Sequence, residues 1–420
     1  FAEIQRKGVK RNMQEREAQR VFLVGVDTGE YDAALSIREL EELAESAGAV
    51  CVGNAIQKRE HYDSATCVGE GKLMEIREFC QAEDVELLIF DLELSATHLR
   101  NIEKLSGLPV IDRNMLILDI FAQHAVTSEG KLQVELAQQK YILPRLSGLG
   151  QSLSRLGGGI GTRGPGESQL ETDRRHIRRR ITALEGKLKE VEQRRAVTRR
   201  QREKNNVPVV AIVGYTNAGK STLLNALTDA GVLEENKLFA TLDPTARALR
   251  LPSGKKILLV DTVGFIRRLP HQLVEAFKST LEEAVYADTV LILCDITDDD
   301  ADEKLEVTRS LLKELGAGDK PTLLAYNKCD LAPQVGSNSA QRVYLSAKTG
   351  MGFDALLAAV EESLACTVKR ERLLLPYSEG GWERRIADKG QIYSKEYTEE
   401  GILLDADVDV TIYKALSGYI

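Results

Sequence analysis

A glycine-rich stretch with a lysine and a serine at fixed spacing, from Gly214 to Ser221, has the clearest chemical meaning in the sequence. It matches GxxxxGK[ST] and lies between an apolar run and a helical pattern. In such a loop several backbone N–H groups point at one phosphate, and the dipole of the following helix favours the negative charge. The lysine reaches the β- and γ-phosphates, and the serine hydroxyl is a Mg²⁺ ligand. We therefore expect Lys220 and Ser221 to bind a nucleoside triphosphate and its Mg²⁺.

A second pattern, Asp261-Thr-Val-Gly264, follows the apolar run of residues 255–260. Its carboxylate can hold Mg²⁺ through water, and the Gly264 N–H can contact the γ-phosphate. The segment of residues 239–245 lies between the two patterns, and a threonine in it can complete the Mg²⁺ shell when a γ-phosphate is present. We expect Thr241 to do so, with Thr245 as the alternative.

A third pattern, Asn327-Lys328-Cys-Asp330, follows another apolar run. A carboxylate at Asp330 can accept hydrogen bonds from guanine N1–H and the exocyclic amine, whereas adenine would leave it unpaired. A hydrogen bond to a charged group contributes roughly 1.5–3 kcal/mol, so the discrimination can be large. We expect Asn327 to brace this loop and the Lys328 stem to pack over the base. The later Ser346-Ala347-Lys348 would place the Ala347 N–H at guanine O6.

These patterns predict a GTPase with Mg²⁺ as its cofactor and GTP as its substrate. The expected catalytic groups are Lys220, Gly264 and Thr241, and the expected Mg²⁺ ligands are Ser221, Thr241 and, through water, Asp261. The residues expected to contact GTP are Gly214, Tyr215, Thr216, Asn217, Ala218, Gly219, Lys220, Ser221, Thr222, Phe239, Ala240, Thr241, Leu242, Asp243, Asp261, Thr262, Val263, Gly264, Asn327, Lys328, Asp330, Ser346, Ala347 and Lys348.

The elements that must position these residues are short apolar runs separated by helical patterns. From residue 207 onward this alternation predicts a doubly wound α/β domain of about 160 residues. Apolar runs at 21–26, 49–53, 85–90 and 110–112 alternate with helical patterns at 32–47, 72–81 and 95–105, with Ser95 as a helix N-cap. This alternation predicts a small N-terminal α/β unit with a parallel sheet.

Between these two parts the pattern is helical. One helix is predicted from Met115 to about Arg145, and a second begins near Gln169. The second helix carries apolar residues at intervals of 4, 3, 4 and 3, which is a coiled-coil seam; they are Ile177, Ile181, Leu184, Leu188 and Val191. Its expected partners on the first helix are Leu132, Leu136, Leu143 and Leu146. We predict an antiparallel hairpin whose tip is the glycine-rich stretch of residues 157–166, although its composition alone is equally typical of a flexible linker.

The predicted domains are an N-terminal α/β domain over 1–113, the hairpin over 114–205, a GTPase domain over 206–372 and a small C-terminal α/β piece over 373–420. The 6 cysteines form no ligand-like cluster, which indicates reduced thiols in the cytoplasm and no structural zinc. No apolar run approaches the ~20 residues needed to span a bilayer.

Charge is unevenly distributed along the chain. The net charge is −8, but residues 163–204 hold 14 Lys/Arg against 7 Asp/Glu, so the remainder carries −15. This asymmetry favours one segment that faces a polyanion. A solvated helix face is the alternative explanation for its arginines.

The ordered patterns resemble the TRAFAC class of P-loop GTPases, and the resemblance narrows to the HflX family. The similar segments are GEGK (69–72), VIDR (110–113), LDIFAQ (118–123), GKLQVELAQ (130–138), GTRGPGESQLETDRR (161–175), GYTNAGKST (214–222), LFATLDPT (238–245) and DTVGFIRRLP (261–270). The resemblance covers residues 21–375. It implies a bacterial, cytoplasmic GTPase that binds the ribosome, chiefly the large subunit, and splits or rescues stalled or idle ribosomes under stress. We expect the protein to be a monomer.

In this family the hairpin loop approaches ribosomal RNA near the peptidyl-transferase centre. The expected RNA contacts are Arg163, Arg174, Arg175, Arg178 and Arg179. Two other functions stay open: a switch that binds a protein effector and never touches RNA, and a GTPase that assists assembly of the large subunit or RNA modification.

Two residues depart from or extend the GTPase pattern. Ras-like proteins carry a water-orienting glutamine after DxxG, whereas Phe265 stands here and cannot polarise water. We therefore expect slow turnover that a partner stimulates, since completion of such a site in trans can raise the rate about 10³–10⁵-fold. Alternatively, Phe265 only packs in the interior, and a water held by the backbone reacts slowly.

Asn217 stands where potassium-activated GTPases carry an asparagine ligand, so K⁺ is a candidate second cofactor.

Overall fold

The computed structural model describes residues 18–153, 169–204, 207–228, 245–268, 278–332, 335–365, 368–389, 392–416 and 419. They fall into two compact units. The first comprises Phe1–Gln123 and Lys140–Arg178, and the second comprises His124–Gln139 and Arg179–Ile420.

The first unit is built on a four-stranded sheet of order β2-β1-β3-β4, in which every pair is parallel. The strands are β1 (Gln19–Asp27), β2 (Ala49–Lys58), β3 (Leu87–Phe90) and β4 (Val110–Asp112), with helices α2 (Ala33–Ser46), α3 (Glu70–Ala82) and α4 (Ala96–Ser106) between them. The Ser95 side chain accepts a hydrogen bond from the His98 N–H and so caps α4, as predicted. Phe22, Leu88 and Phe90 lie in the core. The predicted parallel α/β unit is confirmed.

The prediction of one helix from Met115 to Arg145 is wrong. The structure has two helices there, α5 (Arg113–His124) and α6 (Ser128–Leu153). The break falls before Thr127, whose hydroxyl accepts from the Gly130 N–H at 3.0 Å and whose carbonyl accepts from the Lys131 N–H at 3.1 Å. A threonine that caps in this way begins a new helix. α6 also contains Pro144 and continues past the predicted end near Arg145 to Leu153.

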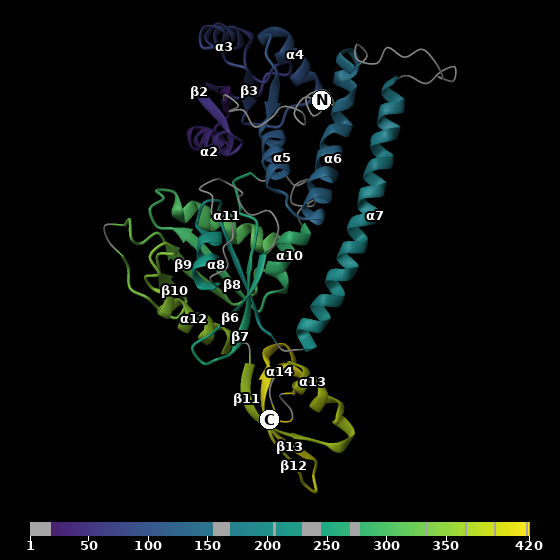
Figure 1. Cartoon of the computed structure of the whole chain (residues 1–420), viewed down its shortest axis with the longest axis vertical. Coiled ribbons are helices and arrows are strands. Elements are labelled where there is room, and N and C mark those ends of the chain that lie inside the picture. Colours follow the sequence, from purple (N-terminus) through teal and green to yellow (C-terminus); the bar gives the residue numbers. More distant parts are fainter. Residues whose placement is uncertain are drawn as a thin grey trace. The chain divides into compact units, whose positions relative to one another are not determined.

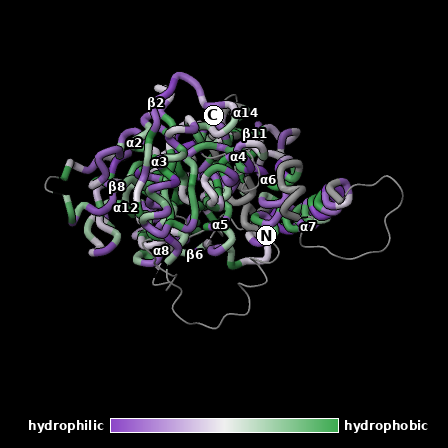
Figure 2. The backbone as a smooth tube through the Cα atoms, turned by 90° about the horizontal axis from the view of Figure 1, so that it is seen from above, coloured by the Kyte–Doolittle hydropathy of each residue, from purple (hydrophilic) through white to green (hydrophobic). Residues whose placement is uncertain are grey.

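The second helix of the predicted hairpin is α7 (Gln169–Lys204), drawn beside α6 in Figure 1. Within the second unit, Arg180 pairs with Glu135 at 2.6 Å and Arg195 pairs with Glu129 at 3.0 Å. A later residue of α7 thus meets an earlier residue of α6, which confirms the antiparallel course. Figure 2 shows hydrophilic and hydrophobic residues alternating along α7. Leu184, in the middle of the predicted seam, is buried.

The sheet of the second unit has the order β10-β9-β8-β5-β7-β6. Its strands are β5 (Val209–Gly214), β6 (Thr245–Arg250), β7 (Lys256–Asp261), β8 (Thr289–Asp295), β9 (Thr322–Asn327) and β10 (Arg342–Tyr344), and its helices are α8 (Lys220–Thr228), α10 (Lys278–Tyr286), α11 (Ala301–Glu314) and α12 (Phe353–Ala365). The five predicted strands run parallel, which confirms the doubly wound domain. The sequence did not predict β6, which adds antiparallel to β7 at the sheet edge.

A smaller antiparallel sheet of order β11-β13-β12 follows. It comprises β11 (Val368–Leu375), β12 (Ile392–Tyr397) and β13 (Ile402–Asp409), with the 3-10 helix η1 (Tyr377–Glu379) and the helices α13 (Gly381–Lys389) and α14 (Val410–Leu416). Leu373, Ile386 and Leu404 belong to its separate hydrophobic cluster. The three boundaries between the four domains predicted from the sequence remain a proposal. Among the residues that the structure describes, no helix combines the length and apolarity needed to cross a membrane.

Candidate nucleotide-binding site

The loop between β5 and α8 requires glycine at two positions. Gly214 has φ +153°, and a Cβ there would lie 2.3 Å from the Leu293 carbonyl oxygen. Gly219 has φ +91°, and a Cβ there would lie 2.3 Å from Asn327 Nδ2. Asn217 between them has φ +62°, a left-handed conformation that asparagine tolerates. The sequence pattern therefore reflects close backbone packing as well as a curl toward phosphate.

Lys220 is buried at the start of α8. Its ammonium donates hydrogen bonds to the Gly214 carbonyl at 3.1 Å and to the Tyr215 carbonyl at 2.8 Å. Burial lowers the pKa of this ammonium to about 8, against the opposing attraction of Asp261. A triphosphate beside it would favour its charged form.

Ser221 and Asp261 bring two oxygen ligands together. The Ser221 hydroxyl donates to Asp261 Oδ2 at 2.8 Å, and Asp261 is fully buried at the end of β7. Mg²⁺ usually keeps several waters and binds through one or two protein oxygens plus the phosphates of its substrate. The pair fits that donor set. No group of three or more His, Cys, Asp or Glu side chains that could hold a metal occurs in the described part of the chain.

Gly264 lies directly against the phosphate loop. A Cβ on Gly264 would approach Thr216 Cγ2 to 2.8 Å and Lys220 Nζ to 3.0 Å. The next residue pairs with the loop through its backbone: the Phe265 N–H donates to the Gly214 carbonyl at 3.1 Å, and the Thr216 N–H donates to the Phe265 carbonyl at 2.9 Å. The Phe265 side chain is only 1% exposed. It is packed in the interior, so it neither polarises nor orients a water.

Asn327 joins three loops. Its Nδ2 donates to the Ala218 carbonyl at 2.8 Å, and its Oδ1 accepts from the Ala347 N–H at 2.9 Å. The phosphate loop, the loop after β9 and the loop after β10 are thereby fixed to one another. Lys328 pairs with Asp295 at the end of β8. Asp330 is exposed, so its carboxylate is accessible to a base.

Four of the predicted segments gather at the carboxyl edge of one sheet. They are residues 214–222, 261–264, 327–330 and 346–348, which follow β5, β7, β9 and β10. In doubly wound folds this edge is where ligands bind. Phe239, Ala240, Thr241, Leu242 and Asp243 lie outside the described residues, and so does Arg163.

The remaining predicted RNA contacts lie near the start of α7. Arg174 is half-buried, whereas Arg175, Arg178 and Arg179 are exposed. Arg178 lies 3.9 Å from Glu171, which is a loose surface contact. The arginine-rich turns of α7 are thus largely accessible to a polyanion.

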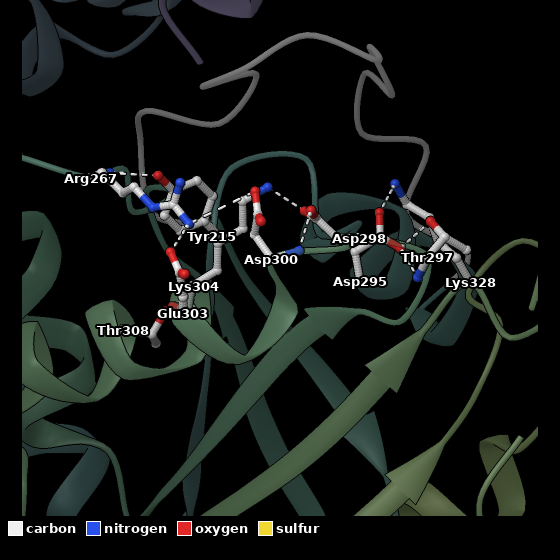
Figure 3. A network of polar contacts seen from close by, with 10 residues as sticks. All are labelled: Tyr215, Arg267, Asp295, Thr297, Asp298, Asp300, Glu303, Lys304, Thr308 and Lys328. Carbon is white, nitrogen blue, oxygen red and sulfur yellow. Dashed lines mark hydrogen bonds and ion pairs between the residues drawn. The ribbon is translucent and has the colours of Figure 1, made fainter. Parts of the chain in front are cut away.

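Sequence reasoning missed a polar network beside the phosphate loop, which is drawn in Figure 3. Tyr215 and Arg267 lie at one end of it, and Asp295 and Lys328 lie at the other. The Arg267 N–H donates to the Tyr215 hydroxyl at 2.6 Å. Tyr215 occupies a variable position of the glycine-rich pattern and Arg267 lies outside it, so only the tertiary structure brings them together.

Three family models match the chain. The model for the N-terminal region of GTP-binding GTPases matches residues 34–122, the model for their middle region matches 124–202, and the model described as a 50S ribosome-binding GTPase matches 209–328. GTPase HflX of Caldanaerobacter subterraneus subsp. tengcongensis is 50% identical and aligns with 96% of this chain and 94% of its own length.

The comparisons include one further relative and one solved structure. GTPase HflX of Lacrimispora saccharolytica is 51% identical over 95% of this chain and 96% of its own length. A crystal structure of a GTP-binding protein from the hyperthermophilic archaeon Sulfolobus solfataricus, in complex with GDP, is 27% identical and covers 83% of this chain and 99% of that chain at a TM-score of 0.44.

Proposed function

We propose that this chain, which belongs to the HflX family of GTPases, hydrolyses GTP on the large ribosomal subunit and uses that cycle to split or rescue stalled or idle ribosomes under stress. The observation that carries the proposal is the interlocked pocket, in which Asn327 ties the phosphate loop to both base-recognition loops. The match of residues 209–328 to a family described as 50S ribosome-binding GTPases supports the choice of partner. We propose that the protein acts as a monomer in the cytoplasm.

Each part of the pocket has one proposed task. The backbone of residues 214–219 binds the phosphates and Lys220 neutralises them, because it is held at the start of α8 by two loop carbonyls. Asp330 accepts hydrogen bonds from guanine, and the Ala347 N–H meets its O6. Gly264 presents its N–H to the γ-phosphate, a contact that GDP does not offer.

Ser221 and Asp261 would hold Mg²⁺, Asp261 through water, and Thr241 would join them when the γ-phosphate is present. Bound there, Mg²⁺ would neutralise charge that develops on the phosphate oxygens. The donor pair at 2.8 Å supports this assignment. Asn217 is exposed on the phosphate loop and is the proposed K⁺ ligand. Equal turnover in KCl and NaCl would contradict the K⁺ assignment.

Hydrolysis by the protein alone should be slow, since Phe265 is buried and supplies no polar group to the reacting water. The ribosome would then provide or order the missing positioning group. The test is a GTPase assay with and without purified large subunits. A rise in turnover of about 10³-fold or more is expected, on the order of known completions in trans. Fast turnover that the subunit does not change would overturn the proposal.

The arginines of α7 would carry the contact with ribosomal RNA. Their exposure and the local excess of positive charge support this role. Co-sedimentation of the protein with large subunits in the presence of a GTP analogue separates this function from that of a switch for a protein effector. Precursor particles that accumulate in cells lacking the protein would instead favour a role in assembly.

A further inference from the structure

The Tyr215 side chain packs beneath the segment that follows DTVG. It belongs to the phosphate loop but is only 6% exposed. Its hydroxyl oxygen accepts a hydrogen bond from the Arg267 N–H at 2.6 Å. The aromatic ring also lies under a cation, because Lys304 Nζ stands 5.1 Å from the ring centroid. One side chain of the phosphate loop thus contacts both the segment after Gly264 and helix α11.

Helix α11 secures the other side of the same segment. The Arg267 guanidinium lies 2.9 Å from Glu303 and 4.0 Å from Asp300, at the start of α11. Lys304, one residue further, pairs with Asp298. Figure 3 shows Tyr215, Arg267, Glu303 and Lys304 grouped at one end of the network. The Arg267 backbone is therefore held by Tyr215 and its side chain by α11.

These contacts add to the backbone pairing of Phe265 with residues 214 and 216. Two backbone hydrogen bonds at Phe265 and one at Arg267 fix the chain on the carboxyl side of Gly264. Gly264 itself has no side chain with which to anchor, and a Cβ on it would touch Thr216 and Lys220. The direction of the Gly264 N–H therefore depends on how the neighbouring residues are held. Phe265 is held by backbone atoms of the phosphate loop, whereas the Arg267 N–H is held by a side chain of that loop, the Tyr215 hydroxyl.

We infer that Tyr215 is a positioning residue for GTP hydrolysis: its hydroxyl holds residues 265–267 so that the Gly264 N–H is directed at the γ-phosphate. The inference rests on the proposed function, because it concerns the same pocket. GDP has no γ-phosphate, so the Tyr215 hydroxyl affects turnover of GTP and leaves GDP binding unchanged. This separates its role from that of a residue that merely stabilises the phosphate loop.

The test is the substitution Tyr215→Phe, which removes the hydroxyl and keeps the ring under Lys304. Loss of one neutral hydrogen bond corresponds to a factor of roughly 2–12, so kcat should fall about threefold to tenfold. The KM for GTP and the Kd for GDP should stay within about twofold of wild type. Hydrogen exchange of the Arg267 amide, followed by mass spectrometry on peptides covering 262–268, should become faster by a similar factor.

Tyr377→Phe is the matched control, since the Tyr377 hydroxyl also makes a 2.6 Å hydrogen bond, to the Thr398 carbonyl, but at an exposed site after β11. It should change neither kcat nor the exchange of residues 262–268. Arg267→Gln is a second variant, which removes the contacts with Glu303 and Asp300 while the Arg267 N–H remains. It should lower kcat without loss of GDP affinity.

Unchanged kcat and unchanged exchange in Tyr215→Phe would overturn the inference. So would a loss of GDP affinity as large as the loss of kcat, because that result indicates damage to the phosphate loop. All assays are run with and without large ribosomal subunits. A wild-type protein that the subunits fail to stimulate contradicts the proposed function instead, whatever the variant does.

Discussion

Replacement of Asn327 by alanine should weaken GTP and GDP binding equally. The Asn327 side chain is 2% exposed and makes one hydrogen bond to the Ala218 carbonyl and one from the Ala347 N–H. Neither bond touches the γ-phosphate region. The substitution therefore loosens the base-recognition loops from the phosphate loop for either nucleotide, and any selective effect on GTP would need another cause.

The expected magnitude follows from the burial of both partners. Ala218 is 2% exposed and Ala347 is 4% exposed, so water cannot readily replace the lost side chain. Removal of one partner leaves the other buried and unpaired at a cost of about 1–3 kcal/mol, so the two partners together give a total of roughly 2–6 kcal/mol. Part of that total lowers the stability of the domain. The rest lowers the fraction of molecules whose loops are arranged to bind nucleotide. If that fraction falls to about a tenth, the dissociation constants for GTP and GDP both rise about tenfold.

Calorimetric titration with GDP and with a non-hydrolysable GTP analogue measures both constants. Asn327→Asp should be intermediate, because a carboxylate still accepts from the Ala347 N–H but cannot donate to the Ala218 carbonyl. Asn338→Ala is the control: Asn338 Oδ1 accepts from the Tyr344 N–H at 2.9 Å at an exposed site, so neither affinity should change. Wild-type affinities in Asn327→Ala, or a loss confined to the GTP analogue, would refute the reasoning.

Three further predictions concern single groups of the pocket and of α7. Burial lowers the pKa of Lys220 to about 8, and a bound triphosphate should restore the charge of its ammonium. GTP binding at pH 8.5 should therefore take up more than half a proton and weaken as the pH rises further. Calorimetry in two buffers of different ionisation heat measures this proton uptake, and its absence would contradict the assignment of Lys220. Asp330→Asn should shift preference from GTP toward xanthosine triphosphate, and unaltered guanine selectivity in competition binding would show that Asp330 does not read the base. Charge reversal of the four α7 arginines should abolish co-sedimentation with large subunits but leave GTP affinity unchanged, and surviving association would remove them as RNA contacts. Those arginines are Arg174, Arg175, Arg178 and Arg179.

The parallel strands of the nucleotide-binding domain could be predicted because strands covered on both faces are continuous apolar runs. Val209–Gly214 and Thr289–Asp295 are such runs, and the chemical motifs follow directly after them. β6 escaped prediction since it lies at the edge of the sheet and its sequence, TARALR, is only partly buried. A half-exposed strand without aromatic residues is difficult to distinguish from a loop.

The junction of α5 and α6 shows a second limit. The sequence between them contains no glycine or proline, and its helical pattern continues without interruption. The break coincides with a capping contact in which the Thr127 hydroxyl accepts a hydrogen bond from the Gly130 N–H. The only proline nearby, Pro144, lies inside α6 and does not end it. Local propensity therefore did not reveal the boundary between α5 and α6.

The individual polar partners of buried side chains could not be predicted when they lie far apart in the chain. The sequence indicated that Asn327 braces a loop, but its partner Ala218 is 109 residues away and follows only from the packing of β5 and β9 around β8. Arg113 is similar: it is buried against Glu39 and Asp91, far apart in the chain, and the VIDR pattern gave no hint of either. Such partners are brought together by the tertiary fold, and no local pattern in the sequence indicates them.

We propose that the pocket separates nucleotide affinity from turnover. Asn327 fixes the loops to which we assign the base and the α- and β-phosphates, which GTP and GDP share. Residues 264–267 are fixed by other contacts, from Phe265 and Arg267 to residues 214–216 of the phosphate loop, on the side where we propose that only GTP places a phosphate. Because the Phe265 side chain is interior, a stimulating partner cannot act by exposing a hidden catalytic group there without breaking that packing. We therefore propose that the ribosome accelerates hydrolysis by contributing or ordering groups around Gly264, and that it leaves base recognition unchanged.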